Sequence, residues 1–142
     1  MKLNEFTIGQ EFRTKSFTLT TQNIMEFANE YDPQYMHLDE EKAIQSKFNG
    51  IIASGMQTLA ISFKLWVEEG KYGEDIIAGT RMNNIKFIKP VYPDDSLHTV
   101  VKVIGIKEMK NETGILTVKL STYSDKGDRV FQGELSALIK NE

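Results

Sequence analysis

The sequence predicts an α+β fold in which an antiparallel sheet wraps around one long helix. Residues 51–70 carry the longest helical pattern of the chain, and that pattern is apolar on most of its sides. Four segments in which apolar and polar residues alternate then follow one another, at 76–89, 96–108, 114–124 and 129–140. Consecutive strands that follow a buried helix pack most economically as one sheet around it.

The helical segment combines a wide apolar stripe with a thin polar side. The stripe consists of Met56, Leu59, Ala60, Phe63, Trp66 and Val67. Ile61 and Leu65 fill part of the remaining circumference, and Gly70 is a natural stop. At 1.5 Å per residue, positions 56–69 would span about 21 Å. We therefore expect the helix to be surrounded by protein on most sides.

Turn signals separate the predicted strands. The segment "SDKGD" at 124–128 favours a tight hairpin between the last two strands. The segment "KPVYPDD" at 89–95 contains two prolines, which excludes a central strand there.

The first part of the chain predicts an extended arm followed by short helices. Residues 11–20 alternate like a strand, and Thr20 or Thr21 is a candidate cap for the helix that follows. That helix would present Ile24, Phe27, Ala28 and Tyr31 on one face and end before Pro33. Asp39 is a candidate cap for a further short helix, "EEKAIQS".

Composition narrows the class of protein. The chain of 142 residues is expected to form a single domain over 1–142, and a sheet around one helix leaves edges that predict a homodimer or higher homo-oligomer. With 17 basic and 20 acidic residues and no basic block, nucleic-acid binding is not expected. The absence of cysteine excludes thiolate metal sites and fits a cytoplasmic protein. No apolar run reaches the roughly 18 residues of a membrane span.

The stretch "YDPQYMHLDE" at 31–40 carries a candidate acid–base pair. Asp32 and His37 are close enough in sequence for a folded loop to bring both side chains to one water molecule. A carboxylate and an imidazole together can orient and deprotonate that water. The alternative interpretation is that Asp32 caps a helix and His37 is an ordinary loop histidine.

The stretch "FNGIIASGM" at 48–56 leads into the long helix. Gly55 falls in the first helical turn, where backbone N–H groups have no partner in the helix and suit a developing oxyanion. The alternative is a glycine that only permits tight packing. Ser54 is a more plausible helix cap than a nucleophile, because no base is placed to activate it.

Together with "IKFIKPVYPDDSL", these two stretches resemble the MaoC-like acyl dehydratase family, which includes (R)-specific enoyl-CoA hydratases. The resemblance covers nearly the whole chain and implies the hotdog fold, usually as a dimer. It also implies reversible addition of water to a trans-2-enoyl thioester, carried on coenzyme A or on an acyl carrier. Coenzyme A would then be part of the substrate, and no separate cofactor or metal is expected.

The resemblance assigns roles to individual positions. Asp32 and His37 match the catalytic pair, and Gly55 matches the glycine whose amide polarises the thioester carbonyl. Gln34, Ser54 and Asn84 are candidate substrate-binding residues. The chain departs from the hydratase pattern at a few positions. Gln34 and Tyr35 replace Asn and Pro, Ser54 replaces His, Phe63 replaces a serine, and Asp94 replaces a glycine. The next residue, Asp95, matches the aspartate of the same family turn, which implies a role in turn structure.

Two other functions remain open at the level of sequence. A hotdog acyl-CoA thioesterase would need an acid on the central helix near Gly55, but the first acids are Glu68 and Glu69 at the far end. A non-catalytic acyl-thioester-binding protein is the other alternative. Arg81, Lys86 and Lys89 are candidates for contacting the phosphates of the carrier, and His98 is expected to be an ordinary strand histidine.

Overall fold

The computed structural model describes residues 1–142 and contains one antiparallel sheet. Its strands lie in the order β1-β4-β5-β6-β3, and β2 pairs with β4 beside β1. The four long strands lie within a few residues of their predicted positions. The strands are β1 (Glu11–Arg13), β2 (Phe17–Thr18), β3 (Ile76–Phe87), β4 (Ser96–Met109), β5 (Thr113–Ser124) and β6 (Arg129–Lys140).

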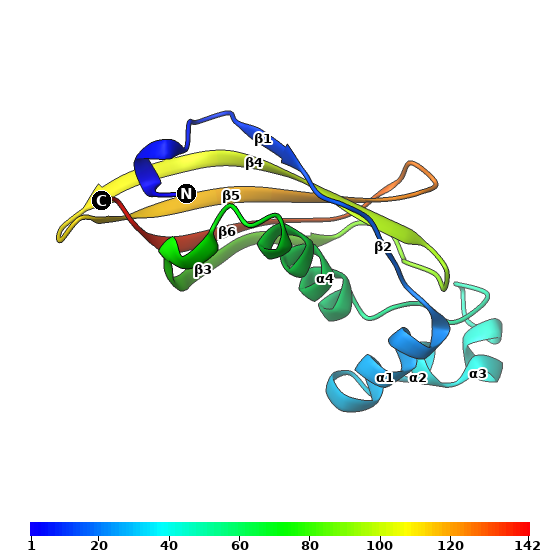
Figure 1. Ribbon diagram of the computed structural model, residues 1–142. Coiled ribbons are helices and arrows are strands. Elements are labelled where there is room, and N and C mark those ends of the chain that lie inside the picture. Colours follow the sequence, from blue (N-terminus) through cyan, green and yellow to red (C-terminus); the bar gives the residue numbers. More distant parts are fainter.

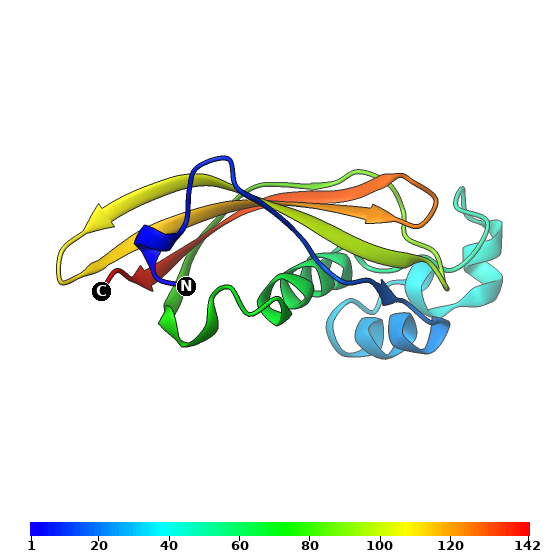
Figure 2. The same cartoon turned by 45° about the horizontal axis from the view of Figure 1, so that its top comes forward.

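The long helix, α4 (Gly55–Glu68), lies against the concave face of the curved sheet (Figures 1 and 2). This is the predicted arrangement, but the helix is shorter than the predicted 51–70. Residues 51–54 form an extended, buried segment before it, because Ala53 N–H pairs with the Val91 carbonyl at 2.8 Å instead of with a helical acceptor.

The predicted buried face of α4 is partly wrong. Ile61, Leu65 and Trp66 are buried against the sheet as expected for apolar residues. In contrast, Met56, Phe63 and Val67 of the predicted stripe are exposed by 56%, 40% and 41%. The physical reason is that one sheet covers one side of the helix, so the opposite side of an almost entirely apolar helix is left open.

Polar side chains fill part of the buried side of α4. The Ser62 hydroxyl donates to the Thr58 carbonyl at 2.7 Å and contacts the Thr122 hydroxyl on β5. Thr122 in turn contacts the Thr99 hydroxyl on β4 at 2.8 Å. Buried hydroxyls are tolerated when each finds a partner, and these tie the helix to two strands.

Three short helices precede α4 and gather at one end of the sheet (Figure 1): α1 (Thr21–Tyr31), α2 (Tyr35–Leu38) and α3 (Glu40–Gln45). Thr20 caps α1, since its hydroxyl accepts from the Asn23 N–H at 3.1 Å. Asp39 caps α3 by accepting from the Lys42 N–H at 3.1 Å. Both predicted caps are confirmed, whereas α2 is a single turn that the periodicity did not indicate. Two 3-10 turns, Leu3–Glu5 and Gly73–Asp75, complete the secondary structure.

The connection between β3 and β4 is a structured loop. Asp95 is buried, its carboxylate accepts from the Tyr92 N–H at 2.9 Å, and Lys126 pairs with it at 3.1 Å. Asp94 has a left-handed backbone with φ of 70°, where the family pattern has glycine. The turn role predicted for Asp95 is confirmed, and the loop lies beside the segment that enters α4, where the Val91 carbonyl accepts from the Ala53 N–H.

None of the helices combines the length and the hydrophobicity that crossing a bilayer requires.

Candidate active site

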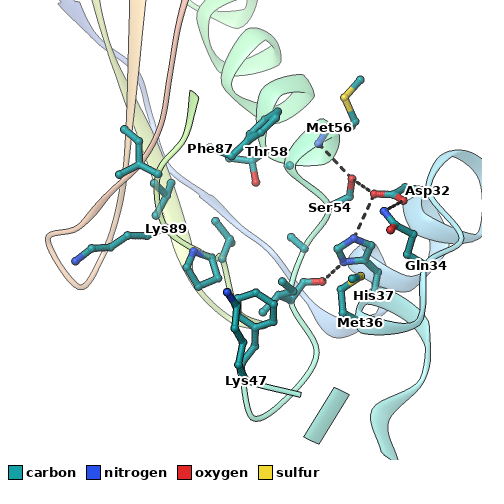
Figure 3. A pocket seen from close by; sticks show the side chains of 18 residues that line it. Asp32, Gln34, Met36, His37, Lys47, Ser54, Met56, Thr58, Phe87 and Lys89 are labelled. Carbon is teal, nitrogen blue, oxygen red and sulfur yellow. Dashed lines mark hydrogen bonds and ion pairs between the residues drawn. The ribbon is translucent and has the colours of Figure 1, made fainter. Parts of the chain in front are cut away.

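A cavity of about 570 Å³ lies at the N-terminal end of α4. Its walls come from the turn between α1 and α2, the segment that enters α4, and the end of β3 with the following loop. Figure 3 shows Asp32, Ser54 and His37 pointing toward one another on one side, with Phe87 and Lys89 on the other. The apolar lining consists of Met36, Phe48, Ile52, Ala53, Met56, Phe87, Ile88, Val91 and Val130.

Asp32 and His37 are brought together by the first turn after α1. Asp32 is the residue at which α1 ends, and His37 is buried in the single turn of α2. The His37 Nε2 lies 3.2 Å from the Asp32 Oδ2. The other ring nitrogen, Nδ1, lies 2.7 Å from the Ile52 carbonyl oxygen, which can only accept. Nδ1 therefore carries a proton, and Nε2 is the nitrogen that can exchange one with Asp32 or a water molecule.

Each oxygen of the Asp32 carboxylate has a donor of its own. The Ser54 hydroxyl donates to Oδ2 at 2.7 Å, and the Gln34 amide donates to Oδ1 at 2.6 Å. The Ser54 hydrogen bond is the largest influence and holds the pKa of Asp32 below its usual 3.8. Partial burial raises this pKa, while Gln34 and the charge of His37 lower it further. The carboxylate form is thus the stable one.

Gly55 is the first residue of α4, and its N–H takes part in no hydrogen bond. The next N–H, of Met56, is capped by the Ser54 hydroxyl at 3.2 Å, so Gly55 provides the free donor at this helix end. A Cβ at position 55 would lie 2.8 Å from the Phe87 ring. This contact supports the interpretation that Gly55 permits tight packing. It does not conflict with a donor role, because packing concerns the missing Cβ and the donor is the backbone N–H.

The cavity includes five of the six predicted site residues: Asp32, His37, Gly55, Gln34 and Ser54. The sixth, Asn84, lies elsewhere on β3. It has a left-handed backbone with φ of 52°, and its side chain donates to Glu134 at 3.1 Å. Asn84 is therefore not part of this cavity in the single chain.

The cationic residues of the cavity differ in part from those expected. Lys89 lines it and pairs with Asp128 at 3.0 Å, while Arg81 and Lys86 do not line it. Lys47, which sequence reasoning missed, lines it from the loop after α3 and forms no ion pair. Its position seven residues before Ser54, next to the apolar segment entering α4, is the signal that could have indicated it.

His98 and Ser62 make structural contacts outside the cavity. His98 stacks on Tyr123 with ring centroids 5.6 Å apart, and burial followed by the charge of Arg13 lowers its pKa. The structure contains no group of three or more His, Cys, Asp or Glu side chains able to hold a metal ion. Ser62 faces the sheet, so it does not supply the hydroxyl that Phe63 lacks.

This arrangement can perform acid–base chemistry on a small electrophile. A carboxylate and an imidazole that meet at one point can hold a water molecule and take its proton. A free N–H at a helix N-terminus can stabilise negative charge that develops on an oxygen. Asp32, His37 and Gly55 all line the same cavity, whose walls are otherwise mostly apolar.

Comparisons with known proteins show which families and folds this chain resembles. Residues 4–124 match the MaoC like domain. The chain is 67% identical to the YdeM protein of Bacillus subtilis over 140 residues, 99% of each chain. It is 28% identical over 105 residues to 3-hydroxyacyl-thioester dehydratase Z of Mycobacterium tuberculosis, covering 71% of this chain and 68% of that protein. A MaoC-like dehydratase structure from Rhodospirillum rubrum superposes with a TM-score of 0.91 at 30% identity, covering 100% of this chain and 98% of that one. The predicted hotdog fold is confirmed.

Proposed function

Because the chain belongs to the MaoC-like dehydratase family, we propose that it adds water reversibly across the C2–C3 double bond of a trans-2-enoyl thioester. The observation that carries this proposal is the meeting of Asp32 and His37 in a cavity that is also lined by Gly55, whose N–H forms no hydrogen bond. The chemistry needs a proton-handling pair on one side of the reacting carbons and an oxyanion donor near the thioester carbonyl.

In the proposed reaction, Asp32 and the Nε2 of His37 hold one water molecule. The pair takes a proton from this water as its oxygen bonds to C3, and the electrons of the double bond move toward the thioester oxygen. The Gly55 N–H stabilises the resulting enolate oxygen, and a single donor of this kind lowers the barrier by about 3 kcal/mol. A proton then returns to C2, which completes the addition; dehydration follows the same steps in reverse.

The rest of the cavity supports a thioester substrate. Its apolar walls suit an acyl chain, and the unpaired ammonium group of Lys47 is available for phosphates of the carrier, coenzyme A or an acyl carrier protein. Lys89 also lines the cavity, and it would contact a phosphate by exchanging its exposed ion pair with Asp128. The carrier belongs to the substrate, so the proposed reaction requires no additional cofactor. The identity of the acyl group is left open by this proposal.

We further propose that the protein acts as a homodimer. Strand β3 is an edge of the sheet with a free hydrogen-bonding side along 12 residues. A groove of about 750 Å³ between α4 and this edge is lined by apolar residues, among them Phe63, Val67 and Met82. A long free edge beside exposed apolar side chains is typical of a surface that pairs with a second copy.

Activity on crotonyl-CoA tests the proposed reaction. Asp32→Asn and His37→Ala should each lower the rate at which enoyl absorbance is lost by at least about 100-fold, because general acid–base catalysis contributes this much or more. His98→Ala is the matched control, since His98 stacks on Tyr123 away from the cavity and should leave the rate unchanged.

The products of the same assay separate the alternatives. Absorbance loss without free thiol indicates hydration, whereas release of free thiol indicates thioester hydrolysis. Folding of every variant is checked by circular dichroism and thermal unfolding. Full turnover by both Asp32→Asn and His37→Ala would contradict the assigned site.

A further inference from the structure

Ser54 connects the N-terminus of α4 to the carboxylate of Asp32. Its side chain is buried, with 1% of the residue exposed. The Ser54 oxygen accepts the Met56 N–H at 3.2 Å, and the same hydroxyl donates to the Asp32 Oδ2 at 2.7 Å. A hydroxyl has one proton, and Asp32 in its stable form offers no proton in return. The direction of both hydrogen bonds is therefore fixed.

We propose that Ser54 is a positioning residue, which holds the Asp32 carboxylate in place opposite His37 and transmits to it the polarity of the helix N-terminus. This inference rests on the proposed function, since it assigns to Asp32 a part in proton transfer. Ser54 lines the cavity, but its hydroxyl is used by Asp32 and the Met56 N–H, so this scheme gives it no substrate contact, unlike the substrate-binding role expected from the sequence. It acts through Asp32.

Among the neighbours of Asp32, Ser54 has the greatest influence on the position and the ionisation of the carboxylate. His37, from α2, is the one titratable group in contact with the carboxylate. Gln34 is neutral and bonds to the other oxygen, Oδ1. From the remaining walls, Lys47 and Lys89 line the cavity, but neither forms an ion pair with Asp32. Ser54 therefore bonds to Oδ2, the carboxylate oxygen that faces His37 and takes part in proton exchange.

The proposed role predicts a specific effect of removing the hydroxyl. Because the Ser54 hydrogen bond lowers the pKa of Asp32, its loss should raise that pKa. Activity requires the carboxylate form, so the acidic limb of the kcat profile should move to higher pH. The kcat should also fall by about tenfold or more, the usual consequence of losing a hydrogen bond to a charged group. KM should stay within about twofold, because Ser54 contacts no substrate.

Ser54 also caps α4, so the variants must separate capping from positioning. Ser54→Gly retains an acceptable cap but has no hydroxyl, and Ser54→Thr retains both. Thr20→Ala removes the cap of α1, away from the cavity, and reports the effect of cap loss alone. We expect low kcat and a displaced acidic limb in Ser54→Gly, recovery of most activity in Ser54→Thr, and wild-type kcat in Thr20→Ala.

A second measurement keeps this inference testable if the enzyme proves inactive on crotonyl-CoA. The carboxyl carbon of Asp32 can be titrated by NMR in the wild type and in Ser54→Gly without any turnover. Titration at higher pH in the variant supports the positioning role even where the proposed reaction fails. Identical titration curves, or an unchanged kcat and pH profile in Ser54→Gly, would show that Ser54 is a helix cap only.

Discussion

At the scale of single residues, the imidazole of His37 is fixed by the backbone around it. Its Nδ1 acceptor, the Ile52 carbonyl, belongs to a segment that is itself held on both sides. The Ile52 N–H donates to the Met36 carbonyl at 3.1 Å, and the Ala53 N–H donates to the Val91 carbonyl at 2.8 Å. The acceptor therefore cannot turn away, and the ring presents one particular nitrogen to Asp32. A backbone carbonyl, rather than another side chain, thus holds the proton on Nδ1 and leaves Nε2 facing the carboxylate.

The ionised state of Asp32 also predicts how stability depends on pH. Its pKa in the folded protein lies below the usual 3.8, so the stabilising contribution is complete above about pH 3.8 and is lost as pH falls through the folded value. Asp32→Asn removes this dependence. Urea unfolding should therefore show the variant approaching the wild type in free energy of unfolding as pH drops below 3.8. A constant difference between the two proteins across this range would contradict the lowered pKa.

At the scale of elements, α4 is both a core helix and the frame of the cavity. Leu65 and Trp66 are fully buried against the sheet, and the helix N-terminus supplies Gly55 and its cap. The hydroxyls of Ser62, Thr122 and Thr99 fix the helix relative to β5 and β4. These contacts fix the helix against the sheet, and they thereby set the position of the Gly55 N–H at the helix N-terminus.

Leu65→Ala should cost about 2–5 kcal/mol of unfolding free energy, because it removes a buried side chain and leaves a cavity in the core. Lys64→Ala on the exposed side is the matched control. It removes a solvent-exposed ion pair with Glu68 at 2.7 Å and should lower the free energy of unfolding far less than Leu65→Ala does. Chemical denaturation of both variants measures these values, and similar losses would argue against the observed orientation of α4.

The sequence predicted these elements where the signals are local. Alternation placed the four long strands, and side-chain oxygens at Thr20, Asp39 and Ser54 marked three helix starts. The orientation of α4 was predicted less well, because an almost entirely apolar helix gives little indication of which side meets the sheet. The single turn of α2 was too short for a periodic signal.

The residues of the site also divide into those with a local signal in the sequence and those that tertiary packing places. Asp32, His37, Ser54 and Gly55 lie within 24 consecutive positions, so a compact turn and one helix start bring them together. Asn84 could not be placed by counting along β3, because the strand register shifts between Asn83 and Lys86 and the alternation of side chains is interrupted there. Lys47 and Phe87 reach the cavity only through tertiary packing.

At the scale of the whole molecule, the single chain leaves an apolar surface uncovered. Strand β3 is exposed along most of its length, and the groove between it and α4 is lined by apolar side chains. Two of the α4 residues that the sequence placed in the core but that are exposed, Phe63 and Val67, line this groove. A second copy seated on this surface would bury both of them and remove that part of the disagreement with the predicted burial.

The double variant Phe63→Glu and Met82→Glu should prevent this association, since it places charges in the apolar groove. Light scattering after gel filtration should give twice the 16.2 kDa chain mass for the wild type and the single-chain mass for the variant. Ile8→Glu is the control, because Ile8 is 57% exposed and does not line the groove. A monomeric wild type, or a dimeric double variant, would contradict the proposed assembly.

The contact between Gly55 and Phe87 limits which amino-acid substitutions position 55 can accept during evolution. A methyl group at position 55 would overlap the aromatic ring, whose nearest atom would be 2.8 Å away. A larger residue there requires the ring of Phe87, which is 54% exposed, to move or to be replaced by something smaller, and either change would alter the shape of the cavity. Substitutions at position 55 are therefore coupled to the side chain at position 87.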